Sequence, residues 1–214
     1  MKDRRAFVAS LAAAVPALAI GARSASAKSK SGADAAFRAC PVVKRGPNAE
    51  HFPKVVLQDQ HKEKAWFYEE LINKKLVMLS FTSSRGERHY PMLNNLVKVH
   101  EMLQSRLGDE AHMYTITTTP SADSSDDLKA LADAHGANWR FFTGESEAVR
   151  EVLRAFNVRG TISGLSWVGN DKTGRWLTQA SRQHPLFIAE AIARLSTGKN
   201  HKPFLIDLRS ARGA

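Results

Sequence analysis

The run KLVMLSFT at residues 75–82 is almost continuously apolar, and it constrains the fold more than any other stretch of the sequence. A strand of this composition is typical of the middle of a sheet that is covered on both faces. The polar stretch SSRGERHY follows at residues 83–90, and apolar residues at helical spacing then run from Met92 to Leu107. The sequence therefore predicts a buried central strand, a polar turn and a helix with Pro91 in its first turn.

Strand and helix patterns alternate on both sides of this run. An N-terminal β-hairpin is predicted from KVVL and KAWF, at residues 54–57 and 64–67, with a short helical turn after it. Further on we expect strands at 112–118 and 139–142, a helix capped by Ser124 or Ser125, a helix at 145–157, a hairpin around GNDKTG and a helix at 185–195. This order predicts an α/β fold in which helices flank a mixed central sheet.

The N-terminus has the pattern of an export signal. Residues 1–27 have a basic start, an apolar run and the small-residue ending Ala-Ser-Ala, which predicts cleavage after Ala27. The pair Arg4-Arg5 resembles the twin-arginine type, although a plain secretory signal also begins with basic residues. The run is too short for a comfortable membrane span. We therefore expect a periplasmic protein without a span after cleavage, with an uncleaved inner-membrane tether as the alternative.

The rest of the chain divides into a flexible lead-in at residues 28–50, one domain at 51–198 and a basic tail at 199–214. The signal contains four basic residues and one acidic residue, so its removal lowers the formal net charge from +10 to +7. The remaining positive charges are scattered and form no stripe with aromatic residues, which argues against nucleic-acid binding. They suit an acidic partner or an anionic membrane surface, or serve solubility alone.

Cys40 is the only cysteine in the chain. A single thiol cannot form a disulfide within the chain, even in an oxidising compartment. We interpret Cys40 as a free thiol without a function, with an intermolecular disulfide or a lone metal ligand as the alternatives.

Several stretches, in the right order, resemble the Sco/SenC family of copper-delivery proteins, which have a thioredoxin-like fold. The resemblance covers about residues 52–196 and is carried by FPKVVLQDQHKEKAWFYEEL, VMLSFTSS, PMLNNLVKV, MYTITTTPSADSSDDLKALADAHG and WRFFTGESEAVREVL. It implies an exported or tethered protein that helps to load copper into cytochrome oxidase. It also implies that copper binds to a Cys-x-x-x-Cys-Pro turn after the central strand and to a histidine before the terminal hairpin.

The sequence departs from the family at these ligand positions. The first cysteine should fall at or beside Ser84, and the second just before Pro91, where the chain has Arg88, His89 and Tyr90. The family histidine should lie near residues 162–163, which are Ile and Ser. Serine cannot replace a thiolate in disulfide exchange, and Cu(I) prefers sulfur ligands. The sequence therefore predicts that the redox and copper chemistry of the family is absent.

Two other chemistries remain as alternatives. A rewired copper carrier could use His89 with Met92 or with Cys40, and a single-thiol redox protein could use Cys40 with a thiol from a partner. No nucleophile elbow, phosphate loop or dinucleotide fingerprint is present, and we expect no enzymatic activity. We expect no bound cofactor, with copper as the alternative.

The polar turn itself is the candidate partner-binding surface, because Arg and Tyr are frequent at the centres of protein interfaces. A drifted, solvated loop is the competing interpretation. The sequence predicts a non-catalytic accessory or assembly factor that binds a periplasmic respiratory or metalloenzyme partner. The positions of this surface are Ser83, Ser84, Arg85, Glu87, Arg88, His89 and Tyr90.

Overall fold

The computed structural model describes residues 37–107, 110–161 and 163–198. The predicted signal, the first part of the lead-in and the basic tail lie outside the described residues. Seven strands form one sheet in the order β2-β1-β5-β4-β3-β6-β7. The strands are β1 (Val56–Asp59), β2 (Lys64–Trp66), β3 (Leu76–Thr82), β4 (Ala111–Thr117), β5 (Arg140–Thr143), β6 (Leu165–Asn170) and β7 (Arg175–Ala180).

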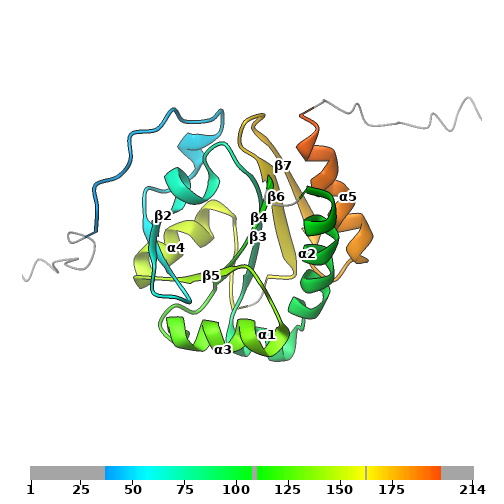
Figure 1. Cartoon of the computed structure of the whole chain (residues 1–214). Coiled ribbons are helices and arrows are strands. Elements are labelled where there is room, and N and C mark those ends of the chain that lie inside the picture. Colours follow the sequence, from blue (N-terminus) through cyan, green and yellow to red (C-terminus); the bar gives the residue numbers. More distant parts are fainter. Residues whose placement is uncertain (1–36, 108–109, 162, 199–214) are drawn as a thin grey trace, which may run out of the picture. The chain divides into compact units, whose positions relative to one another are not determined.

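The sheet is mixed, as predicted. Strand β3 pairs in parallel with β4, and β4 pairs in parallel with β5. The pairs β1–β2, β1–β5, β3–β6 and β6–β7 are antiparallel, so both predicted hairpins are confirmed. All seven residues of β3 are buried, which confirms the prediction of a central strand covered on both faces (Figure 1).

The helices lie on both faces of this sheet. They are α1 (Ser84–His89), α2 (Leu93–Leu107), α3 (Ser125–His135), α4 (Ser146–Ala155) and α5 (Pro185–Ser196), with the short helical turns η2 (Ala49–His51) and η3 (Phe67–Ile72). Helix α3 starts at a capping box made by Ser124 with Asp127, so the structure selects Ser124 from the two predicted caps. None of the helices in the described part of the chain is long and apolar enough to cross a membrane.

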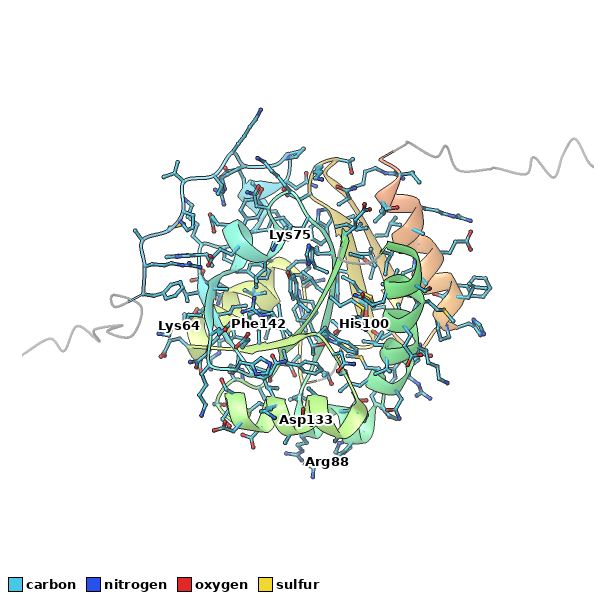
Figure 2. All side chains as sticks on the ribbon, in the orientation of Figure 1. Lys64, Lys75, Arg88, His100, Asp133 and Phe142 are labelled. Carbon is cyan, nitrogen blue, oxygen red and sulfur yellow. The ribbon has the colours of Figure 1, made fainter. Side chains whose placement is uncertain are left out.

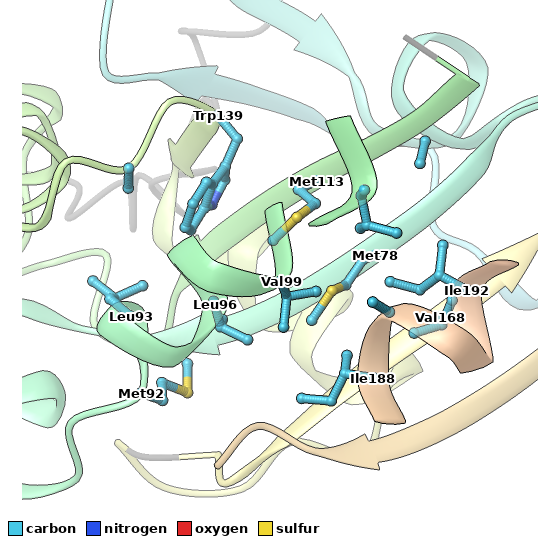
Figure 3. Packing of buried hydrophobic residues seen from close by; sticks show 14 of the residues in the cluster. Met78, Met92, Leu93, Leu96, Val99, Met113, Trp139, Val168, Ile188 and Ile192 are labelled. Atoms are coloured by element: carbon cyan, nitrogen blue, oxygen red, sulfur yellow. The ribbon is translucent and has the colours of Figure 1, made fainter. Parts of the chain in front are cut away.

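Two hydrophobic clusters fill the two faces. Alternate residues of β3 divide between them: Met78 belongs to the cluster under α2, α3 and α5, and Leu79 belongs to the cluster under α4 and η3. Figure 3 shows the first cluster, in which Val99 lies next to Met78 and to which Met92 and Leu96 also belong. The period-two burial of a strand thus serves both layers at once.

The predicted lead-in needs correction in its second half. Residues 37–48 contain no helix or strand, but the segment around Gly46 is fastened to the domain. The backbone N–H of Gly46 donates to the Tyr68 hydroxyl at 2.6 Å, and the Arg45 guanidinium lies 4.9 Å from the centre of the Tyr68 ring. These residues are part of the domain and do not act as a linker.

Two predictions at the end of β3 are wrong. The stretch predicted as a polar turn forms helix α1, and Ser83 caps this helix by accepting a hydrogen bond from the N–H of Gly86. Pro91 lies ahead of α2 and outside its first turn, since the helix begins at Leu93.

Candidate functional site

Helix α1 follows directly from the central strand and is fixed at its first residues. The Ser83 hydroxyl accepts from Gly86 N at 2.9 Å and donates to the carbonyl of Thr161 at 3.3 Å. Gly86 is buried, so this side of α1 faces the domain. A serine that caps a helix in this way satisfies one of its free N–H groups, and the strand-to-helix junction is therefore held in one geometry.

The loop before β6 lies against this junction, as the family pattern requires. The Thr118 hydroxyl donates to the same Thr161 carbonyl at 2.7 Å. A Cβ placed on Gly164 would lie 3.2 Å from the Tyr90 hydroxyl, so this loop also touches the end of α1. Residue 162, one of the two expected histidine positions, lies outside the described residues. The two segments that carry the ligands in the family are thus neighbours here as well.

Asp123 is a buried member of this site that the sequence analysis missed. Its carboxylate accepts hydrogen bonds from the hydroxyls of Thr117 and Thr119, at 2.6 and 2.8 Å, and from Ser84 N at 3.3 Å. It therefore ties the loop after β4 to the first residue of α1. In the sequence, Asp123 is one of several polar residues in the loop before α3. Because that loop was predicted to cap the helix, nothing in it indicated a buried carboxylate.

Glu87 is also buried, although it was predicted to belong to an exposed surface. Its Oε1 accepts from the backbone N–H groups of Met92 and Leu93, at 2.7 and 2.8 Å. These groups stand at the start of α2, where backbone N–H groups have no partner within the helix. The second oxygen, Oε2, is buried and has no hydrogen-bond partner among the described residues. Ser83 and Glu87 are therefore structural and do not contribute to a surface.

The outer side of α1 carries the exposed part of the predicted set. Arg85, Arg88 and His89 are exposed, Ser84 and Tyr90 are half-buried, and neither arginine forms an ion pair within the described residues. Figure 2 shows Arg88 pointing away from the domain.

A hollow of about 350 Å³ lies beside these arginines, lined by Arg85, Gly86, His89 and Thr161. Arg182, which the sequence analysis did not single out, places its guanidinium 5.0 Å from the centre of the Tyr90 ring. Arg182 therefore lies next to the end of α1, and it is brought there by a contact between segments that are distant in the sequence.

The residues proposed as alternative copper ligands do not converge. The Nδ1 of His89 lies 2.9 Å from the carbonyl oxygen of Arg85, within its own helix. Met92 is 1% exposed and packs in the core. In the described residues no three His, Cys, Asp or Glu side chains are arranged to hold a metal ion. Hydroxyl oxygens, one imidazole and guanidinium cations form a donor set that does not fit Cu(I).

Cys40 lies at the other end of the central strand. It is half-buried, and burial raises the pKa of its thiol, which the negative charge of Glu69 raises further. Glu69 belongs to η3, which precedes β3, whereas α1 follows it. Seven strand residues span roughly 20 Å, so Cys40 is not brought to α1. A raised pKa also lowers the fraction of reactive thiolate.

Comparisons with known proteins agree with this geometry. The model of the SCO1/SenC family matches residues 73–172. No protein of curated function matches the chain. The crystal structure of yeast Sco1 is similar, with a TM-score of 0.58 and 17% identity over 67% of this chain and 96% of that one.

Two copper-bound structures are similar as well. The protein from Arabidopsis thaliana has a TM-score of 0.57 and 11% identity, over 68% of this chain and 98% of its own. The protein from Bradyrhizobium japonicum has a TM-score of 0.54 and 15% identity, over 65% and 95%. At these identities the structures establish the fold, which confirms the thioredoxin-like α/β prediction.

Proposed function

From the match of the SCO1/SenC family model to residues 73–172 we propose that the chain is an exported assembly factor of this family and that it binds a protein partner through the outer side of α1. The proposed partner is a respiratory or metalloenzyme subunit in the periplasm, reached after removal of the N-terminal signal. In this proposal the protein performs no thiol redox step and delivers no copper.

One observation carries the proposal: Arg85 and Arg88 are exposed and form no ion pair with any described residue, on a helix whose inner side is held by hydrogen bonds. An exposed cation without an internal partner is available to a carboxylate, and arginine can bind one with two parallel hydrogen bonds. Because Ser83 and Glu87 hold α1 in place, the two guanidinium groups lose little further freedom of the backbone on binding. This arrangement favours a partner with an acidic surface.

The direction of the partner assignment comes from the family. The two similar proteins above are described as copper-bound, and the resemblance implies a role in loading copper into an oxidase. A fold shared with such proteins does not by itself transfer their activity. The proposed role keeps the family's contact with its client and leaves out the metal, because the donor set at α1 does not fit Cu(I).

Charge reversal at α1 tests the proposal in cells. In the source organism, deletion of this chain should lower the activity of the respiratory oxidase or metalloenzyme that it serves. The wild-type chain should restore that activity, and Arg85→Glu/Arg88→Glu should not. The matched control is Lys54→Glu/Lys98→Glu, which changes the net charge equally at two exposed lysines elsewhere and should restore it. Full restoration by the α1 variant would refute the proposed surface.

Cu(I) binding separates this proposal from the copper-carrier alternative. The purified protein is titrated in competition with a Cu(I) chelator of known affinity. We expect no tight one-to-one binding. Tight binding that is lost in His89→Ala would establish a rewired carrier and overturn the proposal, whatever the result in cells.

A further inference from the structure

A second site, unrelated to α1, lies on the face of the sheet that carries α4. It is a cavity of about 520 Å³ between the N-terminal segment, the end of α4 and the β6–β7 hairpin. Cavities of this size accommodate a small ligand or a few side chains. Its walls are mainly aromatic, and the aromatic residues that line it are Phe52, Phe156, Trp167 and Trp176.

The walls of this cavity are held in place by their mutual contacts. The Phe52 ring lies 5.2 Å from Trp176 and 5.8 Å from Phe156, measured between ring centres. The Trp176 indole lies across Gly169, where a Cβ would approach the ring to 2.4 Å. Only glycine at this cross-strand position allows the indole to lie there, so the apolar wall is formed before any ligand arrives.

One polar group in the wall has no partner. The indole Nε1 of Trp176 is buried and makes no hydrogen bond within the described residues. A buried N–H without an acceptor is unfavourable. An occupant with a carbonyl or carboxylate oxygen could accept this hydrogen bond while its apolar groups fill the cavity.

The described chain ends at the turn of the β6–β7 hairpin, whose strands form one wall of the cavity. Gly198 lies against the hairpin turn, since a Cβ placed on it would be 3.9 Å from Cγ2 of Thr173. The next residue, Gly174, accepts a hydrogen bond at 2.6 Å from the side chain of Asn48, which lines the cavity. Residues 199–214 therefore continue from the hairpin turn, which a hydrogen bond joins to Asn48 at the rim of the cavity.

The sequence of this tail matches the cavity in polarity. Its apolar residues are gathered in Phe204, Leu205, Ile206 and Leu208, with basic residues on both sides. Glu50 lines the cavity with a side chain that is 93% exposed, and its Oε1 lies 3.5 Å from the Arg45 guanidinium, so this acidic group at the rim already has one cation beside it. Five residues lie between Gly198 and Phe204, and the six steps along the chain can span roughly 20 Å when extended. That reach suffices to pass the hairpin turn.

We propose that the aromatic cavity binds residues 204–208 of the chain's own C-terminal tail. In this arrangement the side chains of Phe204 and Ile206 enter between the aromatic walls. A backbone carbonyl of the tail accepts from Trp176 Nε1, and the flanking basic residues face Glu50.

The four tryptophans allow a test with an internal control. The indole N–H signals of the purified protein, with its complete tail, are compared by NMR with those of Phe204→Ser/Leu205→Ser/Ile206→Ser. The signals of Trp167 and Trp176 should shift, and those of Trp66 and Trp139, which do not line the cavity, should not. The matched control is Ala211→Ser/Gly213→Ser/Ala214→Ser, which should leave all four signals in place. Unchanged signals of Trp66 and Trp139 in the triple variant would also show that its domain is folded.

Further outcomes decide which chain supplies the occupant. A synthetic peptide of residues 199–214 should return the triple variant's Trp167 and Trp176 signals to their wild-type positions. If the wild-type signals move with protein concentration over a hundredfold range, the occupant comes from a second copy and the proposal is overturned. Unchanged Trp167 and Trp176 signals in the triple variant overturn it as well, and the cavity would then take a different occupant.

Discussion

The two ends of the central strand β3 each contain a buried carboxylate, and the two are used differently. Before the strand, both oxygens of Asp171 are occupied: the Tyr68 hydroxyl lies 3.2 and 3.3 Å from them, and Lys74 N donates to Oδ2 at 2.8 Å. After the strand, Glu87 uses Oε1 twice and leaves Oε2 without a partner within the described residues. Both oxygens of Asp171 are therefore bonded, whereas only one oxygen of Glu87 is.

The difference shows what each end does. At the Asp171 end, burial raises the pKa of the Tyr68 hydroxyl, which keeps its proton and accepts from Gly46 N at the same time. This network fastens the N-terminal segment to the sheet. At the Glu87 end, the carboxylate binds the first N–H groups of α2. On the outer side of α1, Arg85 and Arg88 form no ion pair with any described residue. The Asp171 end thus joins the N-terminal segment to the sheet, and the Glu87 end fixes the position of α1 and its exposed side.

The largest effect is expected at Asp171. In Asp171→Ala, Lys74 N and the Tyr68 hydroxyl lose their acceptor in a buried place, and the free energy of unfolding should fall by about 3 kcal/mol. Asp171→Asn keeps one oxygen acceptor and should lose about half as much. Urea denaturation measures both, with Asp133→Ala, at an exposed ion pair on α3, as a control that should change little. Equal stabilities of Asp171→Ala and wild type would remove the contrast between the two ends.

Glu87 should show a smaller loss. In Glu87→Ala the N–H groups of Met92 and Leu93 lose their shared acceptor, while an unpartnered oxygen is also removed, so we expect about 2 kcal/mol. Glu87→Gln retains an acceptor and should cost less than 1 kcal/mol by the same reasoning. On the outer side of the same helix, Arg85→Ala/Arg88→Ala should change the stability by no more than about 0.5 kcal/mol. Urea denaturation of these three variants compares the two sides of α1 directly, and a loss at the arginines as large as that at Glu87 would contradict the assignment.

These two carboxylates also mark where sequence reasoning ends. The strands, both hairpins and helices α2 to α5 were predictable, because each has a local signal in apolar periodicity, a cap or a turn. Helix α1 has no apolar stripe, and besides its local Ser83 cap it is held by hydrogen bonds from Ser83 to Thr161 and from Ser84 N to Asp123, which no local pattern records. In the same way Asp171 lies in the turn GNDKTG, whose composition accounts for a turn and conceals a buried anchor.

The candidate site was predictable only in part for the same reason. The family resemblance predicted it at the end of β3, and the loop at residue 161 lies beside that end. Which side chains of α1 face solvent depends on how the helix is rotated about its axis. Because the sequence predicted a turn here, it could not predict that rotation. Arg182 joins the face from a segment more than 90 residues away in the chain.

The cap of α3 provides a smaller test on an element that the sequence predicted well. Ser124 Oγ accepts from Asp127 N at 3.2 Å, whereas the buried Oγ of Ser125 has no partner in the described part of the chain. Ser124→Ala should lower the stability by about 1 kcal/mol, and Ser125→Ala should lower it far less.

The same cap has a defined pH dependence. Hydrogen bonds from Ser124 lower the pKa of the Asp127 carboxyl. The stabilisation by this carboxylate is therefore present above the ordinary aspartate pKa and is lost as the pH falls through the lowered value. The difference between the thermal melts of wild type and Ser124→Ala should accordingly shrink in acid, and the part that comes from the bond between Asp127 N and Ser124 Oγ should remain. A difference that stays constant into strong acid would show that Asp127 takes no part in the cap.

Substitution of Cys40 should leave the free energy of unfolding almost unchanged, so the prediction for this residue concerns the reactivity of its thiol. Because burial, and then the charge of Glu69, raises the pKa of the thiol, less thiolate is present at pH 8 than in a free cysteine. Alkylation by iodoacetamide should therefore be slower at pH 8 than for a model thiol, and its midpoint should lie at higher pH. Glu69→Gln should move that midpoint down, since it removes the second cause. An alkylation midpoint at a lower pH than that of a free thiol would contradict the raised pKa. Cys40 would then be an activated thiol, and the Asp171 end of β3 would have a chemical role as well as a structural one.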